Sequence, residues 1–413
     1  MARKRVVFFR GVKSFLRAFL KPLILAVLVF GLIVAFGEKS PLLANQSTAQ
    51  ETAAAALIKD GKMLLEKGLA ESALARWKEA EKIYREIGNY EGIVGSQLNQ
   101  GLALEAMGFY RRSCDVVLAA FPGLKAKKCD ELNEDKIARE DELNEDKIAI
   151  KIEDELNVIL ANQKPLNLIG FNSLVNRLRL LGKWKALEKV LDSDLKVPEE
   201  KASIYLTLGN AARDLASLEK VRKGENLESY KNQAIDYYNG AIALANSQLI
   251  GLQANLNWLS LLTKFEPGNY QEISVRQQEI DGQIRDLLFG NDTPSRKLGY
   301  AIINYAVTLK EIDKNRAIAL LKEGINQAEK LENQRLLSFA KGILGEVEKD
   351  QNQLEEALKI ALKINAEDIA YRWEWQIGKM LKEKGDREGA IAYYRPAFSI
   401  LKDLRENLVA LNR

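Results

Sequence analysis

A recurring spacing of small and bulky residues limits what this 413-residue chain can fold into more than any other feature. A glycine is followed after twelve residues by a small residue, after four more by a core residue that is usually bulky, and after three more by another core residue. The spacing occurs at Gly61, Ala73, Trp77 and Ala80, at Gly101, Ser113, Val117 and Ala120, at Gly378, Ala390, Tyr394 and Ala397 and, more loosely, at Gly345, Ala357, Ala361 and Ile364. The whole pattern recurs from Gly345 to Gly378 and from Val175 to Gly209, with a period of about 34 residues. A period of this length predicts pairs of helices that stack along the chain.

The composition favours helix throughout. Only eight prolines and 27 glycines occur, while Ala, Leu, Glu and Lys are abundant. Small residues at the glycine and alanine positions let the two helices of a unit approach closely, and the bulky residue fills the space between them. Gly108 and Gly385 are placed to end the first helices of their units, where a left-handed residue is needed. Because one unit cannot bury its apolar face alone, neighbouring units must stack.

The period resembles that of the tetratricopeptide repeat, a helix-turn-helix unit of about 34 residues. The resemblance implies an all-α fold, a right-handed superhelical solenoid of such repeats, and we count seven or eight units. In the unit around Gly209 the next small position is Ala234, thirteen places later than the spacing requires, which indicates an insertion. The unit at 300–330 follows the spacing loosely, with Tyr305 at the glycine position, and residues 251–290 are expected to be helical without an assigned register.

We divide the chain into a targeting segment (1–49), two repeats (50–122), a charged insert (123–163) and further repeats (164–413). In the insert, the nonapeptide DELNEDKIA occurs twice, eleven residues apart, which is close to three helical turns. Opposite charges recur there four residues apart, as at Asp135 and Arg139. A calcium site would need a glycine-turned loop of alternating acidic ligands, which the insert lacks. The pattern favours a solvated helical spacer over a cation site.

The N-terminal segment concentrates the positive charge. Residues 1–49 carry eight basic residues against one acid, Glu38, so they contribute +7; the whole chain carries +4, which leaves about −3 for the rest. The basicity therefore gives no support to nucleic-acid binding. Seven of the basic residues precede an uncharged run, 22–37, and small residues then offer cleavage after Ala44 or Ala49.

Sixteen apolar residues are few for a membrane span, which needs roughly 20, and suit a secretory signal peptide. The long basic stretch also fits an uncleaved anchor, and a buried helix is the third interpretation. With a signal peptide or an anchor, the rest of the chain is exported to the periplasm, the thylakoid lumen or the outer face of the membrane. If the segment is an anchor, the N-terminus is cytoplasmic. Membrane contact through this segment is expected only if it is uncleaved.

The chain contains no histidine. This excludes Ser-His and Cys-His nucleophile pairs and removes the commonest general base and transition-metal ligand. No GxxxxGK phosphate loop and no GxGxxG opening a helix after a strand occur. We therefore expect that the chain is not an enzyme and that it has no catalytic residue, cofactor or metal ion. The two cysteines, Cys114 and Cys129, either form a disulfide, as export would permit, or are two small buried residues, and both interpretations stay open.

A concave groove is the surface that a tetratricopeptide resemblance implies for function. In that family the second, fifth, ninth and twelfth positions of the first helix line the groove. With Gly378 as the eighth position, and with the unit around Gly209 added, the candidate partner-binding residues are Arg372, Trp375, Lys379, Lys382, Asn210 and Arg213. Basic side chains there favour a carboxylate or an acidic segment, whereas a solvated polar face is the alternative. Trp373 is expected to be buried against the second helix of the preceding unit.

Several stretches resemble the N-terminal repeat region of cyanobacterial CHAT-domain proteins. These are LGNAARDL, SFAKGILGEVEKDQNQLEEALKIALKI and DIAYRWEWQIGKMLKEKGDREGAIAYY, followed by LKDLRENLVALN. In that family an exported repeat array precedes a caspase-like domain with a His-Cys pair. The resemblance covers most of 55–413, and because the chain has no histidine, no catalytic residue carries over.

The expected function is that of an exported, non-catalytic scaffold that binds a protein or peptide partner through its groove. The alternative is the recognition subunit of a split caspase-like protease whose catalytic half is a separate chain. A relic without a function of its own is the third hypothesis.

The mature N-terminus separates the two targeting hypotheses. A cleaved signal peptide predicts that intact-mass measurement of the native protein finds a chain beginning at Asn45 or Gln50. An intact Met1 or Ala2 on membrane-bound protein would rule out cleavage and leave the anchor.

Overall fold

The structure, a computed structural model, describes residues 41–121, 123–124, 128–129, 159, 165–192, 202–290 and 295–409. The chain divides into two units, 1–54 and 55–413, and the repeats lie in the second. The apolar segment 22–37 and most of the charged insert lie outside the described residues. None of the described helices combines the length and the apolar character needed to cross a membrane.

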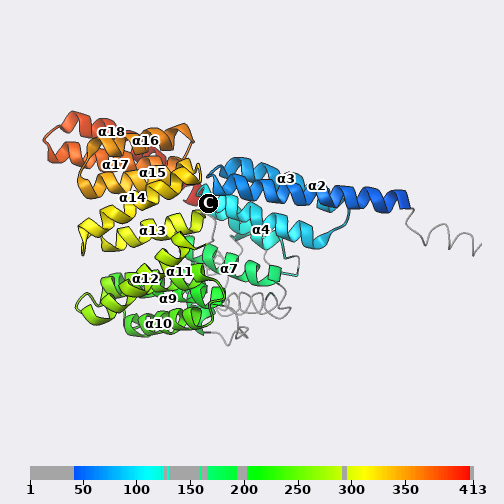
Figure 1. Cartoon of the computed structure of the whole chain (residues 1–413), viewed down its shortest axis with the longest axis horizontal. Helices are drawn as coiled ribbons and strands as arrows, with labels where there is room; N and C mark the ends of the chain where they lie inside the picture. The colour runs from blue at the N-terminus through cyan, green and yellow to red at the C-terminus, as the bar shows by residue number, and fades with distance from the viewer. Residues whose placement is uncertain are drawn as a thin grey trace, which may run out of the picture. The chain divides into compact units, whose positions relative to one another are not determined.

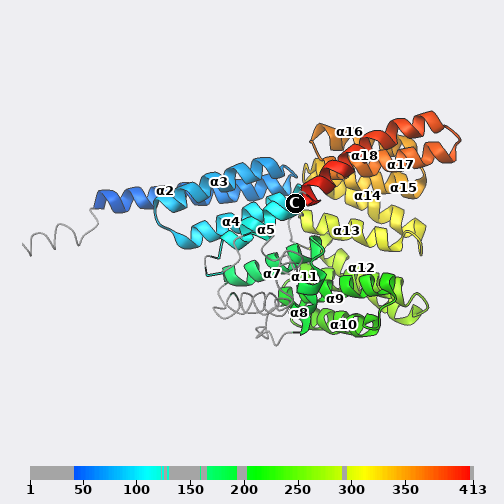
Figure 2. The same ribbon diagram turned by 180° about the vertical axis from the view of Figure 1, so that it is seen from behind.

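The described residues form sixteen α-helices and no strand, so the prediction of an all-α fold is confirmed (Figures 1 and 2). The helices are α2 (Pro41–Glu66), α3 (Ala70–Glu86), α4 (Tyr90–Ala106), α5 (Tyr110–Ala119), α7 (Pro165–Leu180), α8 (Trp184–Asp192), α9 (Ala202–Arg222), α10 (Leu227–Ala243), α11 (Gln248–Phe265), α12 (Tyr270–Phe289), α13 (Arg296–Leu309), α14 (Lys314–Lys330), α15 (Gln334–Glu348), α16 (Gln351–Lys363), α17 (Glu367–Glu383) and α18 (Arg387–Val409). They make eight consecutive pairs within the described ranges. Both views show the pairs from α9 to α18 following one another in chain order, as in a solenoid of helix-turn-helix repeats.

Close contacts between the helices of a pair follow the spacing seen in the sequence. A Cβ atom on Gly61 would lie 2.3 Å from Trp77 Nε1, and one on Gly378 would lie 2.7 Å from Tyr394 Cε1. In both pairs the glycine therefore receives the bulky side chain sixteen positions later. Gly209 receives Tyr238, which lies farther along the chain, because the insertion lengthens α9 to 21 residues before α10 begins.

The unit around Gly345 does not follow that spacing, and its predicted register is wrong. The atoms nearest to a Cβ on Gly345 belong to Asp350, Gln353 and Leu354 at the start of α16, and Ala361 is not among them. Gly345 lies in the last turn of α15, where the chain is about to reverse direction. Its closeness to α16 therefore reflects the turn between the helices and not the contact along their length.

Trp373 is buried as expected, but its main partner is a different helix. Its indole lies over Gly342, and its Nε1 donates a hydrogen bond to Ser338 Oγ at 3.1 Å. Both residues belong to α15, the first helix of the preceding pair, whereas the second helix was predicted. Ser338 Oγ in turn donates to the Ala357 carbonyl of α16 at 2.7 Å, so the tryptophan reaches the second helix through a serine.

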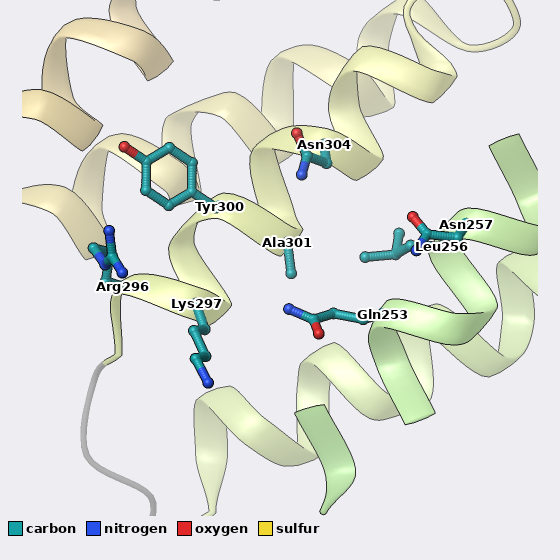
Figure 3. Close-up of a pocket in the computed structure, with 8 residues that line it drawn as sticks. All are labelled: Gln253, Leu256, Asn257, Arg296, Lys297, Tyr300, Ala301 and Asn304. Atoms are coloured by element: carbon teal, nitrogen blue, oxygen red, sulfur yellow. The ribbon is translucent and has the colours of Figure 1, made fainter. Parts of the chain in front are cut away.

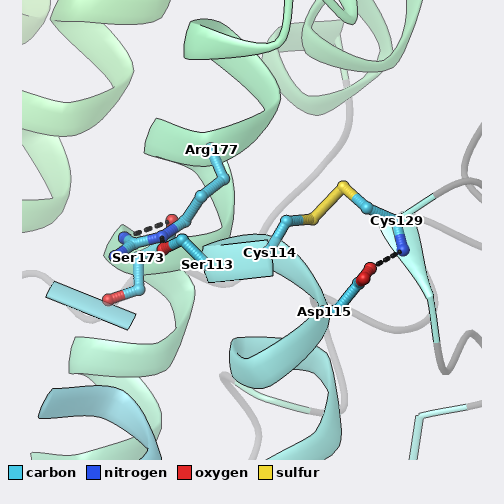
Figure 4. The surroundings of a disulfide bond; sticks show 6 residues. All are labelled: Ser113, Cys114, Asp115, Cys129, Ser173 and Arg177. Atoms are coloured by element: carbon cyan, nitrogen blue, oxygen red, sulfur yellow. Dashed lines mark hydrogen bonds between the residues drawn. A yellow bond between two sulfur atoms is a disulfide. The ribbon is translucent and has the colours of Figure 1, made fainter. Parts of the chain in front are cut away.

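A disulfide joins Cys114 of α5 to Cys129, with 5.7 Å between the Cα atoms (Figure 4). The Asp115 carboxylate accepts a hydrogen bond from the Cys129 N–H at 2.6 Å. Of the two interpretations left open by the sequence, the structure contains the disulfide. It closes a loop at the start of the insert, where constraining the unfolded chain favours folding.

A buried arginine links the repeats on either side of the insert. Arg177 of α7 is 1% exposed and donates to Ser113 Oγ at 2.8 Å and to the Ser173 carbonyl at 2.9 Å (Figure 4). Its Nη2 lies 2.9 Å from Glu105 Oε2 at the end of α4. Burial lowers the pKa of the guanidinium, although Glu105 opposes the shift. Since a buried charge is tolerated when it is paired and hydrogen-bonded, these partners fix α7 against α4 and α5.

Replacement of Gly342 by alanine tests the tight helix contacts. The new methyl group would lie 2.3 Å from Trp373 Cε2, so Gly342→Ala should lower the free energy of unfolding by about 1–3 kcal/mol. Gly282 is a matched control, because it lies within α12 and no atom is within 4 Å of an added Cβ. Gly282→Ala should instead stabilise the helix by about 0.5–1 kcal/mol. Urea unfolding of both variants measures the difference, and equal losses would contradict the contact.

Candidate functional site: a pocket between α11 and α13

The predicted groove residues of α17 lie on an exposed helix face. Arg372, Lys379 and Lys382 are exposed, and Trp375 is 47% exposed. The Trp375 ring lies 4.9 Å from the Tyr394 ring of α18, and the Arg372 guanidinium lies 5.9 Å from the centre of the Phe339 ring. The four side chains share a surface, and their role in binding stays a prediction.

The two predicted residues of α9 are engaged within the protein. Arg213 is partly buried, and its guanidinium donates to Asp214 Oδ1 at 2.9 Å. The other carboxylate oxygen of Asp214 accepts from Arg179 of α7 at 2.7 Å. Asn210 Oδ1 accepts from the Tyr238 hydroxyl at 3.1 Å and from Asn257 Nδ2 at 2.7 Å. The predicted residues therefore fall into two separate groups, on α9 and on α17.

A pocket of about 230 Å³ lies between α11 and α13 (Figure 3). It is lined by Gln253, Leu256 and Asn257 of α11 and by Arg296, Lys297, Tyr300, Ala301 and Asn304 of α13. Both are first helices of consecutive pairs, and they pack against each other. The pocket thus lies on the kind of helix that the repeat resemblance assigned to the groove, but in different units.

The pocket is cationic and rich in amides. In the part of the chain that the structure describes, no carboxylate forms an ion pair with the side chains of Arg296 or Lys297, and the buried Arg296 Nε has no hydrogen-bond partner. Asn257, Gln253 and Asn304 add groups that both donate and accept hydrogen bonds. Since an unpaired buried donor costs free energy, the pocket can stabilise an anionic group placed against these side chains.

Tyr300 forms the wall of the pocket towards α15. Burial raises the pKa of its hydroxyl, and the nearby Arg335 and Arg296 oppose the shift. Its ring lies 6.1 Å from that of Phe339. Arg335 is paired with Asp368 of α17, so it is neutralised beside the pocket. A tyrosine hydroxyl is protonated at neutral pH even at its ordinary pKa of about 10, so the Tyr300 hydroxyl can donate a hydrogen bond.

Asn210 reaches the pocket only through Asn257, whose amide it orients. Asn210, Asn257 and Asn304 lie on the first helices α9, α11 and α13, and each is 47 residues from the next. The equal spacing of these asparagines is a signal in the sequence that could have located the pocket, although it exceeds the usual unit of about 34 residues. It remained hidden because the register of 251–290 was not assigned.

Within the described ranges, no group of three or more Cys, Asp or Glu residues is arranged to hold a metal ion. The six-residue set from the sequence and the pocket share no residue. What connects them is the hydrogen bond from Asn257 to Asn210.

No protein-family model matches this chain, and no curated protein matches it. A solved Rap protein complexed with competence and sporulation factor is 14% identical, with 86% of this chain and 99% of that chain covered and a TM-score of 0.33. A circular tandem repeat protein is 15% identical, with 92% of this chain and 94% of that chain covered and a TM-score of 0.26. At these TM-scores neither likeness bears on the site or on the function.

A buried carboxyl group on α17 makes stability depend on pH. Glu374 is 6% exposed, its Oε2 has no hydrogen-bond partner among the described residues, and burial raises its pKa. Because the pKa is higher in the folded state than in the unfolded state, stability should be greatest below the unfolded value and fall as pH rises through the folded value.

Glu374→Gln removes the buried charge and should raise the stability at pH 7 by about 1 kcal/mol. Thermal unfolding between pH 4 and pH 8 measures the change, and the variant should lose less stability than the wild type as pH rises. Glu383→Gln at the exposed end of α17 is the control and should have little effect. A Glu374→Gln variant that is less stable than the wild type at pH 7 would show that the carboxylate has a stabilising partner.

Proposed function

We propose that this protein is a non-catalytic helical-repeat scaffold that binds an acidic segment of a partner protein in the pocket between α11 and α13. The observation that carries the proposal is that two cations, Arg296 and Lys297, lie beside three amide side chains around one pocket, and that neither cationic side chain forms an ion pair with a carboxylate of the described chain. A charge-assisted hydrogen bond to a ligand carboxylate would satisfy them.

The amide row supports an extended ligand. Neighbouring helix axes lie about 8–10 Å apart, which equals about three residues of an extended chain at about 3.3 Å each. A segment that crosses α11 and α13 would therefore meet Asn257 and Asn304 about three residues apart. An asparagine amide can pair with both a backbone C=O and a backbone N–H, so Asn257 and Asn304 would hold the main chain while the cations select acidic side chains.

Recognition within a split caspase-like protease remains the second candidate, and the resemblance of the stretches at 208–215 and 338–394 favours it. In both candidates this chain supplies the binding surface and no reacting group. The partner distinguishes them, because a split protease requires a partner with a His-Cys pair. The proposal also includes export, for which the basic N-terminus and the apolar segment 22–37 are the support.

Photo-crosslinking tests the proposed site. p-Benzoylphenylalanine at position 304 should crosslink segments rich in Asp and Glu, identified by mass spectrometry, whereas the same group at position 359 should not. Lys359 is an exposed residue of α16, a second helix, and therefore serves as the matched position.

Charge reversal provides the second arm. Lys297→Glu should reduce the crosslinked product at position 304 by about tenfold, because it places a carboxylate in the pocket. Lys359→Glu changes the net charge equally and should leave the product unchanged. The assignment of the pocket would be overturned if positions 304 and 359 crosslinked the same partner segments. It would also be overturned if Lys297→Glu left the amount of crosslinked product at position 304 unchanged.

A further inference from the structure

The turn between α2 and α3 is bound to the first helices of two distant repeats. Glu66 Oε2 accepts a hydrogen bond from the Arg296 N–H at 2.8 Å, and the Glu66 carbonyl accepts from Asn333 Nδ2 at 2.5 Å. Beside them, Lys67 Nζ lies 2.6 Å from Glu332 Oε2. These partners are 230, 267 and 265 residues apart, so the contacts join the first pair to the start of α13 and of α15.

The turn fits closely against the cap of α15. Gly68 has a positive φ of 80°, and a Cβ there would lie 2.6 Å from Asn333 Oδ1. Asn333 is fully buried, and the same Oδ1 accepts from the Leu336 N–H at 2.8 Å, which caps the helix. A side chain at position 68 would therefore displace either the turn or the cap.

The turn between α4 and α5 lies near α17. A Cβ on Gly108, which also has a positive φ, would lie 3.6 Å from Asp368 Cβ. The pKa of the neighbouring Tyr110 is raised by burial and by Asp368, while Arg335 and Arg372 oppose the shift. Two turns of the first repeats therefore lie against the first helices α13, α15 and α17.

The docked turn meets the pocket at Arg296. The first N–H groups of a helix have no partner within the helix, and Arg296 is the first residue of α13. Ser295 Oγ accepts from the Leu298 N–H at 3.2 Å, and Glu66 accepts from Arg296. A carboxylate at this end of a helix is also favoured by the helix dipole. The first turn of α13, which carries both pocket cations, is thus held by Glu66.

We propose that the docked turn, residues 66–68, positions Arg296 and Lys297 for an acidic ligand, so that docking and ligand binding are coupled. This inference rests on the proposed function of the pocket. Release of the turn would leave the first turn of α13 free to fray, and the two cations would lose their fixed direction.

Glu66 acts as a support and not as an internal substitute for the ligand. A substitute would pair its carboxylate with the guanidinium of Arg296 or with Lys297. Glu66 instead binds the backbone N–H and leaves both cationic side chains without a carboxylate partner among the described residues. The two roles predict opposite results, because loss of a substitute would strengthen ligand binding and loss of a support weakens it.

Hydrogen exchange in the full chain tests the docking without a ligand. Gly68→Ala should speed exchange of the Arg296 amide by about tenfold or more, because it pushes the turn away from Asn333. Gly385→Ala is the matched control, because Gly385 has a φ of 87° in the turn before α18 and no atom lies within 4 Å of an added Cβ. Both variants bear the same left-handed strain, so only the contact differs. An unchanged Arg296 amide in Gly68→Ala would overturn the docking.

Peptide binding tests the coupling, with fluorescein-labelled (Glu-Ser)4 as the probe and (Gln-Ser)4 as the neutral control. Fluorescence anisotropy should show that Gly68→Ala and Glu66→Ala weaken (Glu-Ser)4 binding by about tenfold and leave (Gln-Ser)4 binding unchanged. Glu66→Gln keeps an acceptor for the Arg296 N–H and should retain most of the affinity. Gly385→Ala should change neither peptide.

The outcomes separate this inference from the proposed function. If the wild type does not prefer (Glu-Ser)4 to (Gln-Ser)4, the proposed function fails, and the coupling fails with it. The hydrogen-exchange experiment still tests the docking of the turn, because it uses no peptide. If the preference holds but Gly68→Ala binds (Glu-Ser)4 equally well or more tightly, the positioning role is overturned. An equal loss for both peptides would show a general structural effect and would also overturn it.

Discussion

The close approach of helices at small residues is the contact on which the rest of the structure depends. Gly61 receives Trp77, Gly378 receives Tyr394, and Gly342 receives the Trp373 indole from the next pair. Only a hydrogen atom fits where these rings lie, so the helices meet at one depth and in one register. Because every pair must bury its apolar face on the next, this local fit is passed from pair to pair in the described part of 55–413 and sets first helices such as α11 and α13 side by side.

That arrangement creates the site, because the first helices α11 and α13 present their polar residues to a common pocket. Some cations of this chain have carboxylate partners close by, as Arg213 has in Asp214 and Arg335 has in Asp368. The pocket cations have none in the described part, and they lie beside three amide side chains. This combination of unpaired charge and amide groups is the support for the proposed binding site.

The helical pairs could be predicted because the residues in contact within a pair lie close together in the sequence. The site could be predicted only in part. The sixteen-residue distance from the glycine to the bulky residue is visible in the sequence. At Gly345 the same spacing misled the prediction, because this glycine lies at the turn between α15 and α16 and not along their contact. The groove was predicted on first helices, with residues of α9 and α17, and their role in binding stays a prediction. The pocket also lies on first helices, α11 and α13. Whether Asn210 faces a ligand or a neighbouring amide depends on a hydrogen bond to Asn257, 47 residues away, which no single repeat reveals.

The sequence by itself determined an all-helical repeat chain without histidine, since periodic small residues and composition act locally and need no knowledge of distant parts. The tertiary structure alone decided which cations lack partners, that Cys114 and Cys129 are joined, and that Glu66 meets Arg296 across 230 residues. The contact between Glu66 and Arg296 depends on how each successive pair is rotated relative to the one before it, over many repeats. A repeated sequence pattern determines how one pair packs on the next. It does not show which distant repeats the first pair, α2 and α3, will contact.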